Sequence, residues 1–208
     1  MLEGNLWFWI TGSSHISSRE VLIIKHILRE LDSGLVIRLN LLIKYFYPEL
    51  YVENIFSNKI IVETGNGDFI KITVQKPPVN LRFYGYVLYE DVVNYLDLPG
   101  SQLCRDVIVL YDKDNGLYRG IYLSRNVKLR LIEIRGYEPV ILVREGDFVT
   151  KNSSIAYIVT KKREVRNIKS SIDGYVVLIV EIFWEKPERY VLAVVDKNEF
   201  RQIAVREG

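Results

Sequence analysis

Basic side chains gather in one short stretch near residue 165, and they are the residues of this sequence best suited to binding chemistry. Lysine and arginine donate charge-assisted hydrogen bonds to carboxylates and phosphates, and these bonds are stronger than those between neutral groups. We therefore predict a binding surface for an acidic protein partner or a phosphate-bearing ligand. Its candidate residues are Lys161, Lys162, Arg163, Arg166 and Lys169.

Two other interpretations of this basic cluster stay open. A charge-rich turn is often only a solvated part of the protein surface. Strand alternation also places Arg166 on the same face as Glu164, where the two side chains would pair with each other.

The sequence carries no recognisable catalytic or metal-binding constellation. It has no Ser-His-Asp order, no paired-carboxylate motif and no glycine-rich phosphate loop. His15 and His26 have no matching cluster of cysteines or carboxylates, so we predict no metal site. Cys104 is the only cysteine, which excludes an intrachain disulfide, and we expect it to be a small buried side chain. We therefore predict a protein that is not an enzyme and has no catalytic residues.

The composition indicates a globular protein with a substantial core, since 49% of its 208 residues are apolar. A net charge of +2 gives no field that would imply nucleic acid as a partner. The apolar residues 6–10 are too few to span a bilayer and lack a basic leader, so we expect no membrane segment. We predict a cytoplasmic protein, which the single cysteine also favours.

The elements that position the basic cluster begin with a helical segment. Capping-box spacing at Ser17–Glu20 and apolar residues at helical intervals predict a helix that ends at Gly34. Residues 35–46 could form a second helical face, so we predict residues 1–46 to be an N-terminal helical appendage. The β-branched and aromatic runs that follow predict a β-rich central region over residues 47–126.

Short turn motifs define the elements of this central region. Hairpins are predicted around residues 64–68 and 112–116, and a short helix is predicted over residues 90–96. A group of tyrosines near Arg82 suggests either base stacking or core packing, and we favour core packing. These tyrosines are Tyr84, Tyr86, Tyr89 and Tyr95.

The stretch from Gly136 to Asn152, with its Gly146-Asp147 turn, resembles the first half of biotinyl and lipoyl domains. A related apolar run begins again 38 residues later, at Gly174, as an internal repeat. Asn152 stands where those domains usually have glycine, and asparagine also tolerates a left-handed backbone. The resemblance implies a barrel-sandwich (hammerhead) domain over residues 127–208, on a mainly β fold.

In the carriers among those domains, a lysine at a hairpin tip receives the cofactor, and the corresponding residue here is Lys162. The tip reads Val-Thr-Lys-Lys-Arg, whereas biotin carriers read Glu-Ala-Met-Lys-Met and lipoyl carriers read Asp-Lys-Ala. Because the attachment sequence is missing, we expect no biotin or lipoate on Lys162. The hairpin also carries one residue more than the family interval.

From Tyr47 onward the chain resembles an uncharacterised archaeal family of unknown function. The resemblance rests on the β-rich leader, on Arg-Phe-Tyr-Gly-Tyr at 82–86 and on Thr-Lys-Lys-x-Glu-x-Arg at 160–166. We predict a non-catalytic binding or assembly module whose partner is a protein of unknown identity, with nucleic acid not the expected partner. The alternatives are a cofactor carrier modified on Lys162 and an RNA-associated β protein.

Overall fold

The structure is a computed structural model that describes residues 48–160, 162, 164–182 and 187–208. These residues belong to one compact unit, Phe46–Gly208. The predicted helical appendage over residues 1–46 lies outside the described residues, as do Lys161 and Arg163. The described part is mainly β, as predicted.

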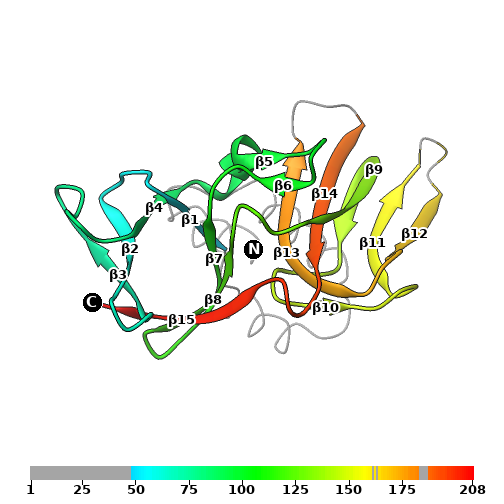
Figure 1. Ribbon diagram of the computed structural model, residues 1–208. Helices are drawn as coiled ribbons and strands as arrows, with labels where there is room; N and C mark the ends of the chain where they lie inside the picture. The colour runs from blue at the N-terminus through cyan, green and yellow to red at the C-terminus, as the bar shows by residue number, and fades with distance from the viewer. Residues whose placement is uncertain (1–47, 161, 163, 183–186) are drawn as a thin grey trace, which may run out of the picture. The chain divides into compact units, whose positions relative to one another are not determined.

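Seven strands form a closed barrel in the order β1-β4-β2-β3-β15-β8-β7, which closes because β7 also pairs with β1 (Figure 1). Strand direction cannot alternate all the way round a ring of seven, so at least one neighbouring pair must be parallel. That pair is β3 and β15, and the other neighbours are antiparallel. The barrel strands are β1 (Glu49–Glu53), β2 (Lys59–Glu63), β3 (Phe69–Thr73), β4 (Phe83–Val87), β7 (Val107–Asp114), β8 (Leu117–Leu123) and β15 (Arg201–Glu207).

Both hairpins predicted in the central region are present. The β2–β3 hairpin has the predicted turn, whereas β7 continues past the predicted turn start to Asp114. The second turn is therefore only Asn115-Gly116, and both residues have positive φ, 49° and 79°. Two left-handed residues between antiparallel strands match the twist of a tight hairpin, and Asn-Gly is the preferred sequence there.

Six further strands form a separate antiparallel sheet in the order β10-β13-β14-β9-β11-β12. The sheet strands are β9 (Arg130–Ile141), β10 (Phe148–Val149), β11 (Ser154–Val159), β12 (Val165–Lys169), β13 (Gly174–Ile182) and β14 (Glu188–Val195).

The last strand returns from the six-stranded sheet to the barrel, as the red strand in Figure 1 shows. We predicted residues 127–208 as one domain, yet β15 pairs with β3 and β8. Backbone pairing in the barrel satisfies its N–H and C=O groups, and no local sequence pattern specifies that partner. The predicted division of the chain into three domains, with boundaries after residues 46 and 126, stays a prediction.

The barrel and the six-stranded sheet share a core. One buried cluster combines Leu50 and Val109 of the barrel with Leu178 of β13 and Ala193 of β14. Two more clusters lie inside the barrel and within the six-stranded sheet. The shared cluster therefore packs the sheet against the barrel as part of one core.

A 3-10 helix, η1 (Tyr89–Tyr95), contributes to the shared core and lies where the short helix was predicted. The two-stranded ribbon of β5 (Leu96–Asp97) and β6 (Gln102–Leu103) follows it. None of the helices in the described ranges is long and apolar enough to cross a membrane.

Core packing of the tyrosines is confirmed, because Tyr84 and Tyr89 are buried and Tyr86 and Tyr95 are partly buried. We expected the Cys104 side chain to be buried, and this prediction was wrong, because the side chain is exposed. Cys104 directly follows the short strand β6, in a connection at the surface.

Candidate functional site

The hairpin between β11 and β12 places Lys162 on an exposed tip. Its base is closed by the Thr160 N–H, which donates to the Glu164 carbonyl at 2.9 Å, and by the Glu164 N–H, which donates to Thr160 Oγ1 at 3.2 Å. These two hydrogen bonds join the residues on either side of the segment 161–163. The Lys162 side chain is thus exposed between β11 and β12.

Two more of the predicted basic residues lie on β12, which is an edge strand of the sheet. Arg166 and Lys169 are both exposed. The predicted pairing of Arg166 with Glu164 is confirmed, with 3.5 Å between Nη2 and Oε2. Both partners are more than half exposed, so water screens this pair and its contribution to stability is small.

Exposed apolar side chains accompany the basic ones on neighbouring strands. Tyr137 of β9 pairs with Val159 of β11, which pairs with Val165 of β12, so the three lie in one row across the sheet. Val165 is 69% exposed and Tyr137 is 41% exposed. The edge of the sheet thus combines positive charge with an apolar row, a combination suited to protein contact.

A second candidate site, which sequence reasoning missed, is an ion-pair cluster around Arg82 at one end of the barrel. The Arg82 guanidinium contacts Glu53 at 2.8 Å and Glu63 at 3.3 Å, and it also contacts Asp106. The Tyr122 hydroxyl donates to Asp106 at 2.5 Å. One arginine therefore joins three carboxylates that come from different parts of the chain.

Asp106 is the most buried carboxylate of this cluster. Burial alone would raise its pKa, but hydrogen bonds from the Arg125 N–H, the Tyr122 hydroxyl and Arg82 together lower that pKa below its ordinary value. The carboxylate is therefore ionised at neutral pH and holds this end of the barrel together.

Arg201, the first residue of β15, extends the cluster to a further barrel strand. Its guanidinium lies 4.9 Å from the ring centroid of Phe69 and 5.2 Å from that of Tyr122. It reaches Glu63 at 3.5 Å between Nη2 and Oε1. Aromatic contacts thus fix the guanidinium, while its ion pair with Glu63 is long.

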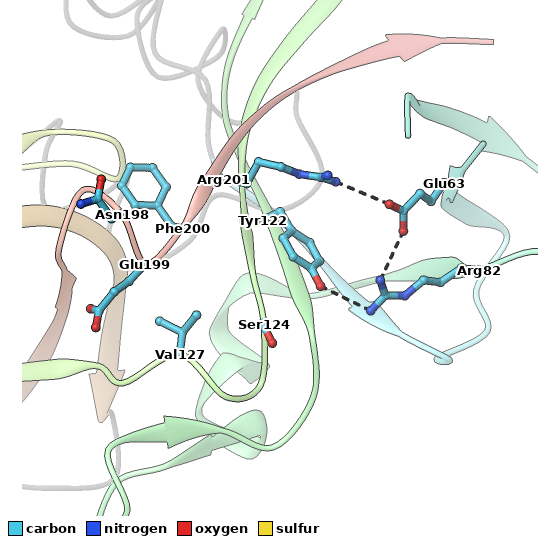
Figure 2. Close-up of a pocket in the computed structure, with 9 residues that line it drawn as sticks. All are labelled: Glu63, Arg82, Tyr122, Ser124, Val127, Asn198, Glu199, Phe200 and Arg201. Atoms are coloured by element: carbon cyan, nitrogen blue, oxygen red, sulfur yellow. Dashed lines mark hydrogen bonds and ion pairs between the residues drawn. The ribbon is translucent and has the colours of Figure 1, made fainter. Parts of the chain in front are cut away.

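A pocket of about 320 Å³ opens beside these residues. Figure 2 shows Arg201, Glu63, Arg82 and Tyr122 joined by a chain of contacts, while Phe200 and Asn198 line the pocket from the segment that leads into β15 at Arg201. The full lining is Glu63, Arg82, Tyr122, Ser124, Val127, Asn198, Glu199, Phe200 and Arg201. The pocket therefore lies between the barrel and the two segments that connect it to the six-stranded sheet.

Sequence reasoning found the hairpin residues because they are close together along the chain. The pocket joins residues that closure of the barrel brings together, such as Arg82 and Arg201. Only the pairing of β15 with β8 sets Arg201 opposite Tyr122. A signal for this site would have required knowledge of the strand order.

The fold and these two regions define a mainly β protein in which a closed barrel is packed against a six-stranded sheet, with a pocket beside their connections. The family described as an uncharacterized protein conserved in archaea (DUF2118) matches residues 45–197, and the chain belongs to this family. It is 27% identical over 159 residues to the uncharacterized protein MJ0859 of Methanocaldococcus jannaschii, covering 74% of this chain and 94% of that protein. The predicted relationship with an uncharacterised archaeal family is confirmed.

Proposed function

We propose that this chain is a non-catalytic binding or assembly module whose β11–β12 hairpin contacts an acidic protein partner. The observation that carries the proposal is the exposure of Lys162, Arg166 and Lys169 on one projecting hairpin at a sheet edge. Positive charges at the surface steer and select a negatively charged partner, and the apolar row beside them supplies area to bury.

The scaffold in this proposal is a biotinyl/lipoyl-like arrangement of the six-stranded sheet. It is supported by backbone hydrogen bonds that join the two repeated halves: the Gly146 N–H donates to the Val176 carbonyl at 2.8 Å, and the Val176 N–H donates to the Asp147 carbonyl at 2.9 Å. Gly146 and Asn152 both have positive φ, 89° and 71°. Asn152 thus adopts the left-handed conformation that glycine and asparagine tolerate best.

The hairpin contact can be tested by reversing its charge. We expect Lys162→Glu/Arg166→Glu/Lys169→Glu to reduce recovery of an acidic partner from an extract of the native host by about tenfold or more, because like charges would then oppose each other. Quantitative mass spectrometry after affinity capture measures the recovery. Equal recovery by the variant and by wild type would refute the hairpin as the contact surface.

A matched control changes the same charge at exposed lysines outside the hairpin. Lys76→Glu/Lys128→Glu/Lys197→Glu should capture the partner as wild type does, since all three side chains are exposed on other segments. Treating the extract with ribonuclease distinguishes direct protein contact from the RNA-associated alternative. A partner protein that is still captured after the treatment supports direct protein contact. Loss of all capture after the treatment would favour the RNA-associated alternative.

A cofactor carrier is the second candidate function, and the exposed position of Lys162 at a hydrogen-bonded hairpin tip is what favours it. We expect this residue to be unmodified because the attachment sequence around it is missing. Intact mass of the protein purified from its native host should equal the mass of the bare chain. A mass increase equal to biotin or lipoate, localised to Lys162 in a peptide digest, would establish the carrier function instead.

A further inference from the structure

We propose that the pocket beside the barrel binds a small zwitterion of α-amino-acid type, with the ligand carboxylate on Arg201 and its ammonium group on Glu63. This site is separate from the basic hairpin and does not depend on the proposed protein contact. The two residues assigned to the ligand charges, Arg201 and Glu63, lie on β15 and β2, and both line the pocket.

The ion pair between Arg201 and Glu63 is loose enough to open. Its 3.5 Å separation exceeds the roughly 2.7–2.9 Å of a good charge-assisted hydrogen bond. The other oxygen of Glu63 lies 3.3 Å from Arg82, which already has Glu53 at 2.8 Å and Asp106 as partners. Glu63 is therefore the least tightly held carboxylate of the cluster.

Arg201 is oriented before any ligand arrives. The rings of Phe69 and Tyr122 lie against its guanidinium, and its side chain is 50% exposed. The ring contacts hold the guanidinium in place, and its N–H donors can give two hydrogen bonds to one carboxylate. Preorganisation of this kind lowers the entropy cost of binding.

Charge balance selects a ligand that carries both signs. The pair contributes one positive and one negative group, so a zwitterion can replace one long ion pair with two shorter ones while the pocket keeps its net charge. A simple carboxylate would leave the Glu63 carboxylate without its Arg201 contact, and a simple amine would leave Arg201 without its Glu63 contact. Either loss carries a desolvation cost.

The remaining walls suit an apolar side chain on the ligand. Val127 and Phe200 supply apolar surface, while Ser124, Asn198 and Glu199 supply polar groups. A volume of about 320 Å³ falls at the lower end of the range for small-molecule pockets. Phenylalanine is therefore a suitable probe, because its ring would pack on the apolar wall.

Titration calorimetry of the full chain at pH 7 with three matched ligands tests the proposal. We expect L-phenylalanine to bind at least about tenfold more tightly than 3-phenylpropionate, which lacks the amine, or 2-phenylethylamine, which lacks the carboxylate. Comparable affinity for the three ligands, or no phenylalanine binding at millimolar concentration, would overturn it.

Two variants assign the ligand charges to residues. In Arg201→Gln, phenylalanine should bind no better than 2-phenylethylamine does, and in Glu63→Gln it should bind no better than 3-phenylpropionate does. Arg119→Gln is the matched control, because this exposed arginine pairs with Asp112 outside the pocket. Thermal melting monitored by circular dichroism shows that each variant is folded, and unchanged phenylalanine binding by both folded pocket variants would overturn the assignment.

Discussion

Replacing Arg82 by methionine is expected to lower the free energy of unfolding by about 3 kcal/mol at pH 7. The substitution keeps a long side chain but leaves Glu53, Glu63 and Asp106 without their shared cation. Breaking a fully buried ion pair by removing one partner costs about 3–5 kcal/mol, and we take the low end because the Arg82 side chain is 40% exposed. Urea unfolding at fixed temperature measures the change.

The loss of unfolding free energy caused by Arg82→Met should be smaller at acidic pH. Because the folded-state pKa of Asp106 is lowered, its ionised form contributes stability above its unfolded pKa of about 3.9, and this contribution is lost as the pH falls through the lower folded pKa. The difference between wild type and Arg82→Met should therefore narrow below about pH 4. A difference that stays constant down to pH 2 would show that lost packing, and not charge, explains the effect.

Arg119→Met provides the control for this experiment. Arg119 also pairs with a carboxylate, Asp112, but at 3.4 Å and with 61% of its side chain exposed. Its removal should cost less than about 1 kcal/mol. A loss as large as that of Arg82→Met would mean that the cluster at the barrel end has no special role.

Replacing Tyr89 by phenylalanine is expected to lower the free energy of unfolding by about 2 kcal/mol. The Tyr89 hydroxyl donates to Glu145 Oε1 at 2.6 Å and accepts from the Ile179 N–H at 3.0 Å, and both contacts are buried. Phenylalanine keeps the ring in place but loses both hydrogen bonds, one of them to a carboxylate. Chemical denaturation followed by circular dichroism measures the loss.

Tyr157→Phe is the matched control for Tyr89, because Tyr157 is 38% exposed on β11. Its hydroxyl can exchange hydrogen bonds with water, so the change should stay within about 0.5 kcal/mol. If Tyr89→Phe is equally mild, then the hydroxyl does not contribute to joining η1 to the sheet. The double variant Tyr89→Phe/Glu145→Gln should recover part of the loss, since it also removes the buried charge.

Local sequence patterns predicted most of the individual strands but not how they are arranged. The β2–β3 and β7–β8 hairpins could be predicted because each pairs strands that are neighbours in the chain, with turn residues between them. The barrel could not be predicted, because its closure depends on β1 pairing with β7 and on β15 pairing with β3. Long-range pairings of this kind leave no local pattern.

The two candidate sites differ in the same respect: one could be predicted from local sequence and the other could not. Lys162, Arg166 and Lys169 were found from their types and spacing, and the structure places them exposed on one hairpin. Arg82 was noted only beside the tyrosines, and Arg201 was not noted at all. Their carboxylate and aromatic neighbours come from distant strands, so neither could be recognised before the fold was known.

The six-stranded sheet also affects the conformational entropy of the barrel into which it is inserted. In the barrel Arg201 lies opposite Tyr122, while in the sheet Arg130, at the start of β9, pairs with Val194, near the end of β14. Once folded, the sheet therefore shortens the effective loop that β15 must close roughly fivefold. This lowers the entropic cost of loop closure by about 1.5 kcal/mol. The sheet thus favours closure of the barrel much as a crosslink would, through the freedom that it removes from the open chain.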